Sequence, residues 1–199
     1  MRDILFILLE YLFGSVLFAR VFCILFKKKD LTQNADDHNP GTANAYIYGG
    51  FACGTSTLIC DILKGFIPVF LYLSNPIGSL FPFVLAAPVI GHAFSAFNRF
   101  GGGKGIAVTF GCLLALIPCW QPVITLALFF IFYSVILKIS PNFYRTVVAY
   151  VSVNIALPFI LGDLQIILGF MLITVVVGIR MFKSSEQKNE FKVGLLWMH

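Results

Sequence analysis

Charged residues are scarce in this sequence. Asp, Glu, Lys and Arg make up 12% of its 199 residues, whereas 59% are hydrophobic. Average soluble domains contain about 25% charged and about 45–50% apolar residues. A water-soluble fold of this length could not bury so much apolar surface. The composition therefore excludes an ordinary soluble enzyme and favours a protein whose solvent is lipid.

The sequence also lacks a recognisable metal site. Its five cysteines lie in or beside apolar runs, in no spacing typical of metal ligands. We therefore expect free, buried thiols, and we expect neither a metal nor another cofactor. The cysteines are Cys23, Cys53, Cys60, Cys112 and Cys119.

Seven apolar runs fill most of the chain. A membrane-spanning helix needs about 20 residues, so the length allows about seven crossings with short loops and no second domain. We predict a single all-α, polytopic membrane domain over residues 1–199. The fourth and fifth runs are short and can be half-length or tilted helices, which leaves the count open by one or two. The first run is too long for a signal peptide and lacks a small-residue cleavage site, so we expect it to be retained. The runs cover residues 4–26, 51–73, 77–97, 105–117, 123–137, 143–161 and 164–182.

Lys and Arg residues gather at alternate turns. They follow the first, third, fifth and seventh runs, whereas the turns after the second and fourth runs carry no charge and the turn after the sixth has only Asp163. The positive-inside rule places all four basic sides in the cytoplasm. This predicts an odd number of spans, with the N-terminus outside and the C-terminus cytoplasmic. The topology accounts for the net charge of +5, so we expect no nucleic-acid partner.

A few ionisable residues lie inside the apolar runs, where they are costly. Asp61 and Lys64 are three residues apart and can pair on one helix face. Either they form a buried ion pair that orients two helices, or Lys64 binds an anion and Asp61 holds it in place. Glu10 and Arg20 lie near helix ends, where such side chains can reach the interface.

A glycine-rich turn at residues 101–105 opens the fourth run and contains Lys104. Glycines let the backbone approach a ligand, and successive N–H groups near a helix start can bind an anion. A phosphate site is one interpretation, and a flexible turn with a cytoplasmic lysine is the other. The turn does not match a nucleotide P-loop, because Asn98 stands at the first glycine position and Gly105 follows the lysine. His92, upstream, is either a packing residue or a base that reaches the same pocket.

Taken in order, these segments resemble the PlsY-type glycerol-3-phosphate acyltransferases of bacteria. Residues 36–44, Asp-Asp-His-Asn-Pro-Gly-Thr-Ala-Asn, stand where that family has Gly-Ser-Gly-Asn-x-Gly-Ala-Thr-Asn. Residues 61–68 resemble its Asp-x-x-Lys-Gly-x-x-Pro motif. Gly91-His92-Ala93-Phe94, followed by residues 100–108, resembles its third motif, Gly-His-x-Phe followed by Phe-Lys-Gly-Gly-Lys-Gly-Val-Ala-Thr. The similarity covers about residues 11–118.

The resemblance implies a multi-pass enzyme of the bacterial plasma membrane, with its active site facing the cytoplasm. Its reaction moves a fatty acyl group from acyl phosphate to glycerol 3-phosphate and gives lysophosphatidic acid for phospholipid synthesis. Its partners would be these two substrates and membrane lipid, and the sequence does not fix the oligomeric state.

The resemblance also suggests roles for site residues. We expect Lys104 and the N–H groups of the glycine turn to bind one phosphate. We expect Lys64, held by Asp61, to assist with the other phosphate or with the carbonyl oxygen. His92 is the side chain best placed to take the hydroxyl proton, although a substrate phosphate could do so instead. The catalytic candidates are His92, Lys104, Lys64 and Asn39, and the substrate-binding candidates are Asn44, Gly41, Asp61, Gly102, Gly103 and Gly105.

Two other functions stay open. Asp37, Ile47 and Gly101 stand where the family has serine, arginine and lysine, which is compatible with a non-catalytic member that binds lipid or acyl phosphate. A small transporter is the other alternative, because of Asp61 and Lys64. It is disfavoured by the lack of paired half-repeats.

Overall fold

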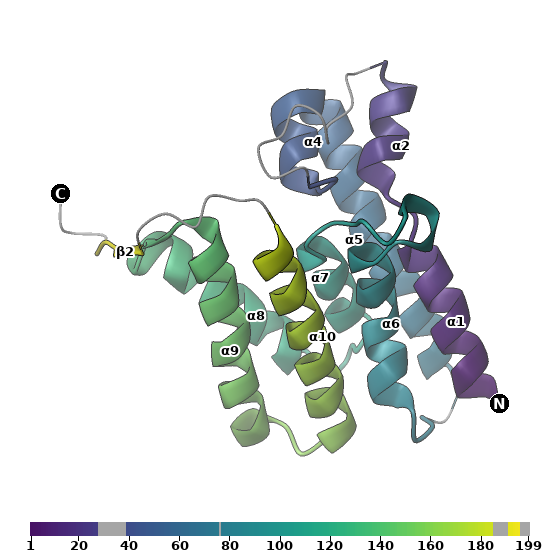
Figure 1. The fold of residues 1–199 in the computed structure, drawn as a ribbon. Helices are drawn as coiled ribbons and strands as arrows, with labels where there is room; N and C mark the ends of the chain where they lie inside the picture. The colour runs from purple at the N-terminus through teal and green to yellow at the C-terminus, as the bar shows by residue number, and fades with distance from the viewer. Residues whose placement is uncertain (28–38, 76, 185–190, 196–199) are drawn as a thin grey trace.

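The computed structural model describes residues 1–27, 39–75, 77–184 and 191–195. Over these ranges the chain is almost entirely helical (Figure 1). The α-helices are α1 (Arg2–Gly14), α2 (Phe18–Leu25), α4 (Thr42–Gly49), α5 (Phe51–Leu73), α6 (Phe81–Ala93), α7 (Ile106–Leu114), α8 (Gln121–Ile131), α9 (Asn142–Ile160) and α10 (Leu164–Lys183). A 3-10 turn η1 (Ala96–Asn98), a π-helical turn η2 (Phe132–Ile136) and the antiparallel two-residue strands β1 (Ile139–Ser140) and β2 (Lys192–Val193) complete the described structure.

Five described stretches are long and apolar enough to cross a membrane, and they correspond to the first, second, third, sixth and seventh predicted runs. The fourth run forms α7, whose 9 residues extend only about 13 Å, less than half of a hydrocarbon core of about 30 Å. The fifth run forms a shorter apolar helix, Gln121–Ile136. The predicted all-α membrane class is therefore confirmed, whereas seven complete crossings stay a prediction. The five stretches are Arg2–Leu25, Phe51–Leu73, Phe81–Asn98, Asn142–Ile160 and Leu164–Lys183.

Helix α6 lies at the centre of the bundle, between α1 on one side and α10 on the other (Figure 1). Its sequence is apolar on every face, as is typical of a helix surrounded by protein. Phe81, Val84, Leu85 and Val89 are all completely buried. Helix α1, by contrast, exposes Ile4 and four leucines, which a membrane would cover.

The backbones of α1 and α6 touch where they cross. A Cβ atom on Gly14 would lie 2.3 Å from the Pro88 carbonyl oxygen, and one on Gly91 would lie 2.1 Å from the Tyr11 carbonyl oxygen. Only glycine allows such an approach, which is how small residues pack membrane helices closely. Just after this contact the first predicted run breaks, because α1 ends at Gly14 and α2 begins at Phe18.

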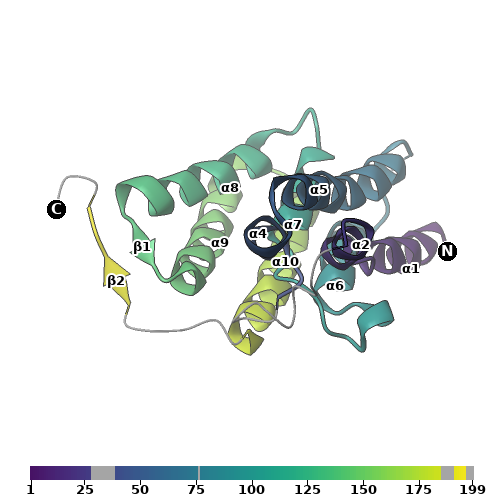
Figure 2. The same cartoon turned by 90° about the horizontal axis from the view of Figure 1, so that it is seen from above.

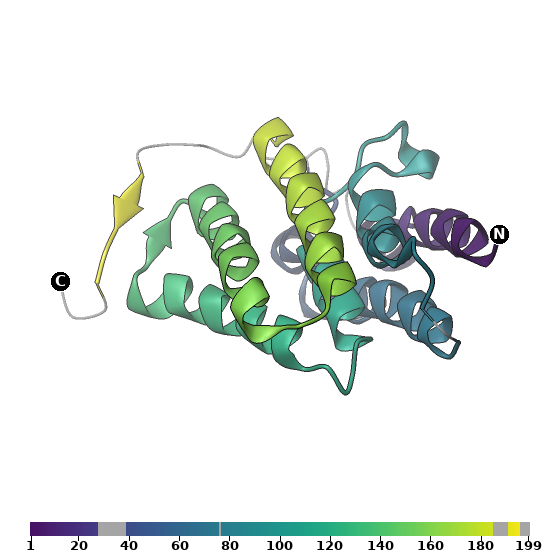
Figure 3. The ribbon, with the colours of Figure 1, turned by 90° about the horizontal axis from the view of Figure 1, so that it is seen from below.

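One end of the bundle collects the starts and ends of helices from distant parts of the chain. The beginnings of α5 and α9 and the ends of α6 and α10 all lie there, whereas Met1 lies at the opposite end (Figure 1). Viewed from that opposite end, α9 and α10 run side by side, and α1 lies on the far side of α6 (Figure 3). Since α6 ends and α9 begins at the same end, α7 and α8 form an excursion into the bundle and back.

Candidate functional site

A cavity of about 420 Å³ brings the predicted motifs together. Its wall comes from the segment before and at the start of α4, from one face of α5, from the end of α6, from the turn that opens α7 and from the start of α9. Seven of the candidate residues line it, although they are far apart in the sequence. The lining residues are Asn39, Gly41, Thr42, Ala43, Asn44, Leu58, Asp61, His92, Lys104, Gly105, Ile106, Ala107, Phe110 and Asn142. Residues 36–38 of the first motif lie outside the described residues.

Lys64 lies behind the cavity wall and is completely buried. Its ammonium nitrogen Nζ is 2.8 Å from Asp61 Oδ1, 2.8 Å from His92 Nδ1 and 2.6 Å from the Val16 carbonyl oxygen. An ammonium group has three N–H donors, so these three acceptors use all of them. Lys64 therefore forms a buried ion pair with Asp61 on its own helix α5, and its other two hydrogen bonds connect α5 to α6 and to the segment between α1 and α2. Lys64 is not among the residues that line the cavity, and its expected help with a phosphate or with the carbonyl oxygen stays a prediction.

The contact with Lys64 fixes the tautomer of His92. A lysine ammonium can only donate, so Nδ1 of His92 accepts, and the ring proton of the neutral imidazole is on Nε2. His92 lines the cavity, and Nε2 is on the ring edge opposite Lys64. In this arrangement His92 presents a hydrogen-bond donor. A base at this position would need the other tautomer.

The glycine turn packs closely against His92. The Gly103 N–H donates to the His92 carbonyl oxygen at 3.0 Å, so it does not face the cavity. A Cβ atom on Gly103 would lie 2.1 Å from His92 Nε2, and one on Gly102 would lie 1.9 Å from the His92 carbonyl oxygen. Neither Gly102 nor Gly103 lines the cavity. In the structure these two glycines make room for His92, and the expectation that their amides bind phosphate stays a prediction.

The start of α7, which was part of the predicted phosphate site, lies at the cavity. Gly105 is the N-cap of α7 and has a φ of 81°, a left-handed conformation that favours glycine. Gly105, Ile106 and Ala107 line the cavity together with the half-buried Lys104. The first N–H groups of a helix have no partner within the helix, and with the helix dipole they favour an anion. The cavity therefore combines a helix N-terminus with a full positive charge.

Asn39 and Asn44 shape the opposite wall. The Asn44 side-chain amide donates to the Asn39 carbonyl oxygen at 2.8 Å, and this hydrogen bond closes the turn that leads into α4. Gly41 is the N-cap of α4 and lines the cavity as well. All three predicted residues of the first motif are thus at the cavity.

Two residues that the sequence analysis had not singled out for the site also contribute. Asn142, at the start of α9, lines the cavity, and Arg145 Nη2 donates to its Oδ1 at 2.6 Å. Arg180, near the end of α10, donates to the Gly102 carbonyl oxygen. The three-residue spacing of Asn142 and Arg145 at a helix start could have predicted that their side chains interact. The sequence around Arg180 shows only a cation near the end of the last apolar run.

The other intramembrane charges lie away from this cavity. Glu10 is completely buried and its carboxylate has no hydrogen-bond partner among the described residues, which corrects the expectation that it reaches an interface. Arg20 donates to Asn98 Oδ1, and the Asn98 amide donates to the Gly101 carbonyl oxygen at 3.1 Å. Arg20 thus supports the glycine turn from outside.

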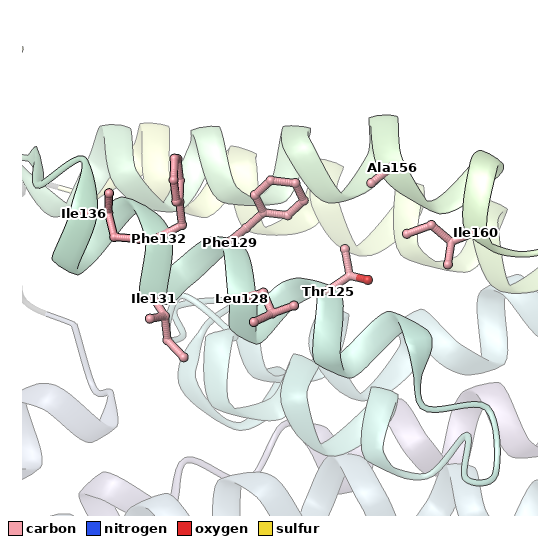
Figure 4. Close-up of a pocket in the computed structure, with 8 residues that line it drawn as sticks. All are labelled: Thr125, Leu128, Phe129, Ile131, Phe132, Ile136, Ala156 and Ile160. Carbon is pink, nitrogen blue, oxygen red and sulfur yellow. The ribbon is translucent and has the colours of Figure 1, made fainter.

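A second hollow of about 510 Å³ lies between α8 and α9 (Figure 4). Its lining contains no ionisable side chain, so it offers no group for acid–base chemistry or phosphate binding. It is lined by Thr125, Leu128, Phe129, Ile131, Phe132, Ile136, Ala156 and Ile160. The 420 Å³ cavity is therefore the candidate functional site.

Fold and site together define a helical membrane protein with a cavity of mixed polar and apolar lining that combines a lysine with a helix N-terminus. Residues 4–188 match the family model described as glycerol-3-phosphate acyltransferase, so the chain belongs to the glycerol-3-phosphate acyltransferase family.

Curated relatives and solved structures agree with this family. A glycerol-3-phosphate acyltransferase of Glaesserella parasuis is 41% identical over 56% of this chain, and that of Latilactobacillus sakei is 42% identical over 70%. The alignments span 55% and 66% of those proteins, less than two-thirds of either. The crystal structure of PlsY, an integral membrane glycerol 3-phosphate acyltransferase, in its glycerol 3-phosphate form matches with a TM-score of 0.77 and 24% identity. That match covers 90% of this chain and 88% of the PlsY chain. The lysophosphatidic acid form matches with a TM-score of 0.74 and 23% identity.

The buried ion pair generates a prediction about stability. Lys64→Met removes the cation that pairs with the buried Asp61 carboxylate, and breaking a buried ion pair in this way typically costs about 3–5 kcal/mol. The double variant Asp61→Leu/Lys64→Met also removes that carboxylate, so we expect it to be more stable than Lys64→Met alone. Thermal unfolding of the purified proteins in detergent measures this. Lys138→Met, at the end of η2, is the control and should unfold like the parent. If the second substitution lowered the unfolding temperature of Lys64→Met further, the two residues would not be coupled in this way.

Proposed function

We propose that this protein transfers a fatty acyl group from acyl phosphate to glycerol 3-phosphate and releases lysophosphatidic acid and phosphate. The observation that carries this proposal is the convergence of the three motif segments on one cavity that combines Lys104 with the start of α7. The family supports the same reaction class. Two phosphate-bearing substrates and an apolar acyl chain suit a cavity inside a helix bundle whose lining combines polar groups with apolar side chains.

In the proposed reaction a glycerol 3-phosphate hydroxyl oxygen attacks the acyl carbon. The new ester C–O bond forms as the bond between that carbon and the phosphate oxygen breaks. Acyl phosphate is already activated, so the protein mainly supplies position and electrostatic stabilisation, and no protein nucleophile is required. Lys104 and the first N–H groups of α7 hold one phosphate, and Asn39 and Asn142 position the acceptor.

His92 has the role of a donor in this proposal. Its Nε2–H would stabilise a phosphate or the oxygen that becomes negative during attack, and Lys64 keeps the ring in that tautomer. The hydroxyl proton then goes to a substrate phosphate, the alternative already recognised from the sequence. Lys64 and Asp61 are positioning residues for His92.

We also propose that the cavity faces the cytoplasm of a bacterial plasma membrane. Described basic residues at the loops and helix ends of the cavity side support this orientation through the positive-inside rule. With α7 and α8 counted as one excursion in and back, the chain makes an odd number of passes, from an outer N-terminus to a cytoplasmic end of α10. Residues 1–199 then form one membrane domain.

Orientation is testable by cysteine labelling in intact cells. In a cysteine-free background, Ser74→Cys lies after α5 at the end opposite the cavity, and Ser184→Cys lies after α10 at the cavity end. A membrane-impermeant maleimide should label Ser74→Cys in intact cells and Ser184→Cys only after permeabilisation. The reverse pattern would contradict the proposed orientation.

Activity is testable with purified protein in bilayer nanodiscs. We expect lysophosphatidic acid from glycerol 3-phosphate and acyl phosphate, and none when acyl-CoA replaces acyl phosphate. Lys104→Ala should lose at least about 100-fold in kcat/KM, because a charge-assisted contact to phosphate disappears from a water-poor site. Lys183→Ala, outside the cavity lining, is the matched control and should keep activity. Full activity of a folded Lys104→Ala protein would refute the phosphate site, and binding without turnover in the parent would favour the non-catalytic alternative.

Two substitutions, each by a residue with an amide side chain, distinguish a hydrogen-bond donor role of His92 from a role as a base. His92→Gln can place an N–H near the position of Nε2, whereas His92→Asn can place an oxygen near Nδ1 and has no group that reaches into the cavity. If His92 donates, His92→Gln should be about ten-fold more active than His92→Asn, the worth of one strong hydrogen bond. If His92 is the base, both variants should be equally inactive, since neither amide can take a proton. The measurement is kcat at saturating substrate.

A further inference from the structure

Two cysteines far apart in the sequence face each other beside the candidate site. Cys23 is on α2 and Cys53 is in the first turns of α5, and their sulfur atoms are 3.5 Å apart. Both are almost completely shielded, with exposed fractions of 3% and 1%. Helices α2, α4 and α5 pack against one another, and the view from above shows the three side by side (Figure 2).

Small residues leave room for the two sulfur atoms. Ala19 and Ala45 are completely buried in the same cluster. A Cβ atom on Gly49 of α4 would lie 2.6 Å from Cys53 Sγ and 3.6 Å from Cys23 Sγ. The sulfurs need to approach by about 1.5 Å to reach the disulfide bond length of about 2.05 Å. The small neighbouring residues therefore leave space for both sulfur atoms, and only a small movement of the sulfurs is needed to form the bond.

We propose that Cys23 and Cys53 are a modification site at which a peroxide forms a reversible disulfide. One thiolate attacks a peroxide oxygen, the O–O bond breaks, and a sulfenic acid and hydroxide form. The second sulfur attacks the sulfenic sulfur, the S–S bond forms, and the oxygen leaves as water. Overall two thiols lose two electrons and two protons, and hydrogen peroxide becomes two water molecules. The 3.5 Å separation places the second sulfur within reach of the sulfenic sulfur as soon as that group forms.

The bond would act on the wall of the cavity. The 30-residue separation between the cysteines encloses α4, its N-cap Gly41 and Asn44. A disulfide would tie α2 to α5 with α4 held against both. Closing a loop of this length restricts the unfolded chain, which raises thermal stability. In the proposed orientation the pair lies on the cytoplasmic side, where disulfides are transient and report oxidants.

Peroxide treatment of the full-length protein in nanodiscs tests the site. After quenching, denaturation and alkylation, the oxidised parent should carry two fewer alkyl groups than the reduced protein. Peptide mapping should find Cys23 joined to Cys53, and dithiothreitol should reverse the change. The unfolding midpoint of the oxidised parent should rise by about 5 °C.

Single substitutions assign the effect to the pair. Cys60→Ser, on the same helix α5, is the matched control and should behave like the parent. Cys23→Ser and Cys53→Ser should form no such bond and show no reversible rise in midpoint. Full alkylation of both cysteines in the peroxide-treated folded parent would overturn the proposal, as would a bond to a different cysteine or an unchanged midpoint. The parent measurements stand on their own if a variant does not fold.

Discussion

The buried ammonium group of Lys64 is the interaction on which the candidate site depends. Its three donors reach the Val16 carbonyl oxygen, Asp61 and His92, and so join the break after α1 with α5 and α6. Replacing a buried ion pair with apolar residues of similar volume is often neutral or stabilising, so this pair is poorly explained as a source of stability. Its effect is geometric, because it fixes the position and the tautomer of His92 at the cavity.

That geometry requires backbones to come unusually close in two places. Gly14 and Gly91 let α1 and α6 touch, which brings the Val16 carbonyl oxygen to Lys64. Gly102 and Gly103 then let the turn before α7 pass over His92. Two hydrogen bonds hold the turn there. The Gly103 N–H donates to the His92 carbonyl oxygen, and Arg180 donates to the Gly102 carbonyl oxygen. Gly102 and Gly103 of the third motif are thus explained by packing around a histidine, and the first residues of the helix that follows them line the cavity.

Sequence periodicity and composition predicted much of the fold but little of the site geometry. Hydropathy located the long helices because lipid requires long apolar stretches, and seven of the candidate residues line one cavity. Hydropathy could not show the break after Gly14, since the residues on both sides are apolar. Which acceptor each Lys64 N–H and the Gly103 N–H reach depends on contacts between distant segments, and no local sequence pattern predicts these contacts. Asn142 was missed for the same reason, since its place at the cavity follows from how α9 packs.

The cations around the cavity bear on how a divergent member of this family could work. Ile47 and Gly101 stand where the resemblance expects arginine and lysine, and Ile47 is 70% exposed on α4, away from the cavity lining. Positive potential at the cavity comes instead from Lys104, from the start of α7, worth about half an elementary charge, and from Arg145 through Asn142. Partial charges fixed in a partly buried site act strongly and need no reorganisation during reaction. In the proposed reaction acyl phosphate brings its own activation, so such fixed charges would have only to bind and align two phosphates, and a smaller number of full cations would weaken binding before it removed the chemistry.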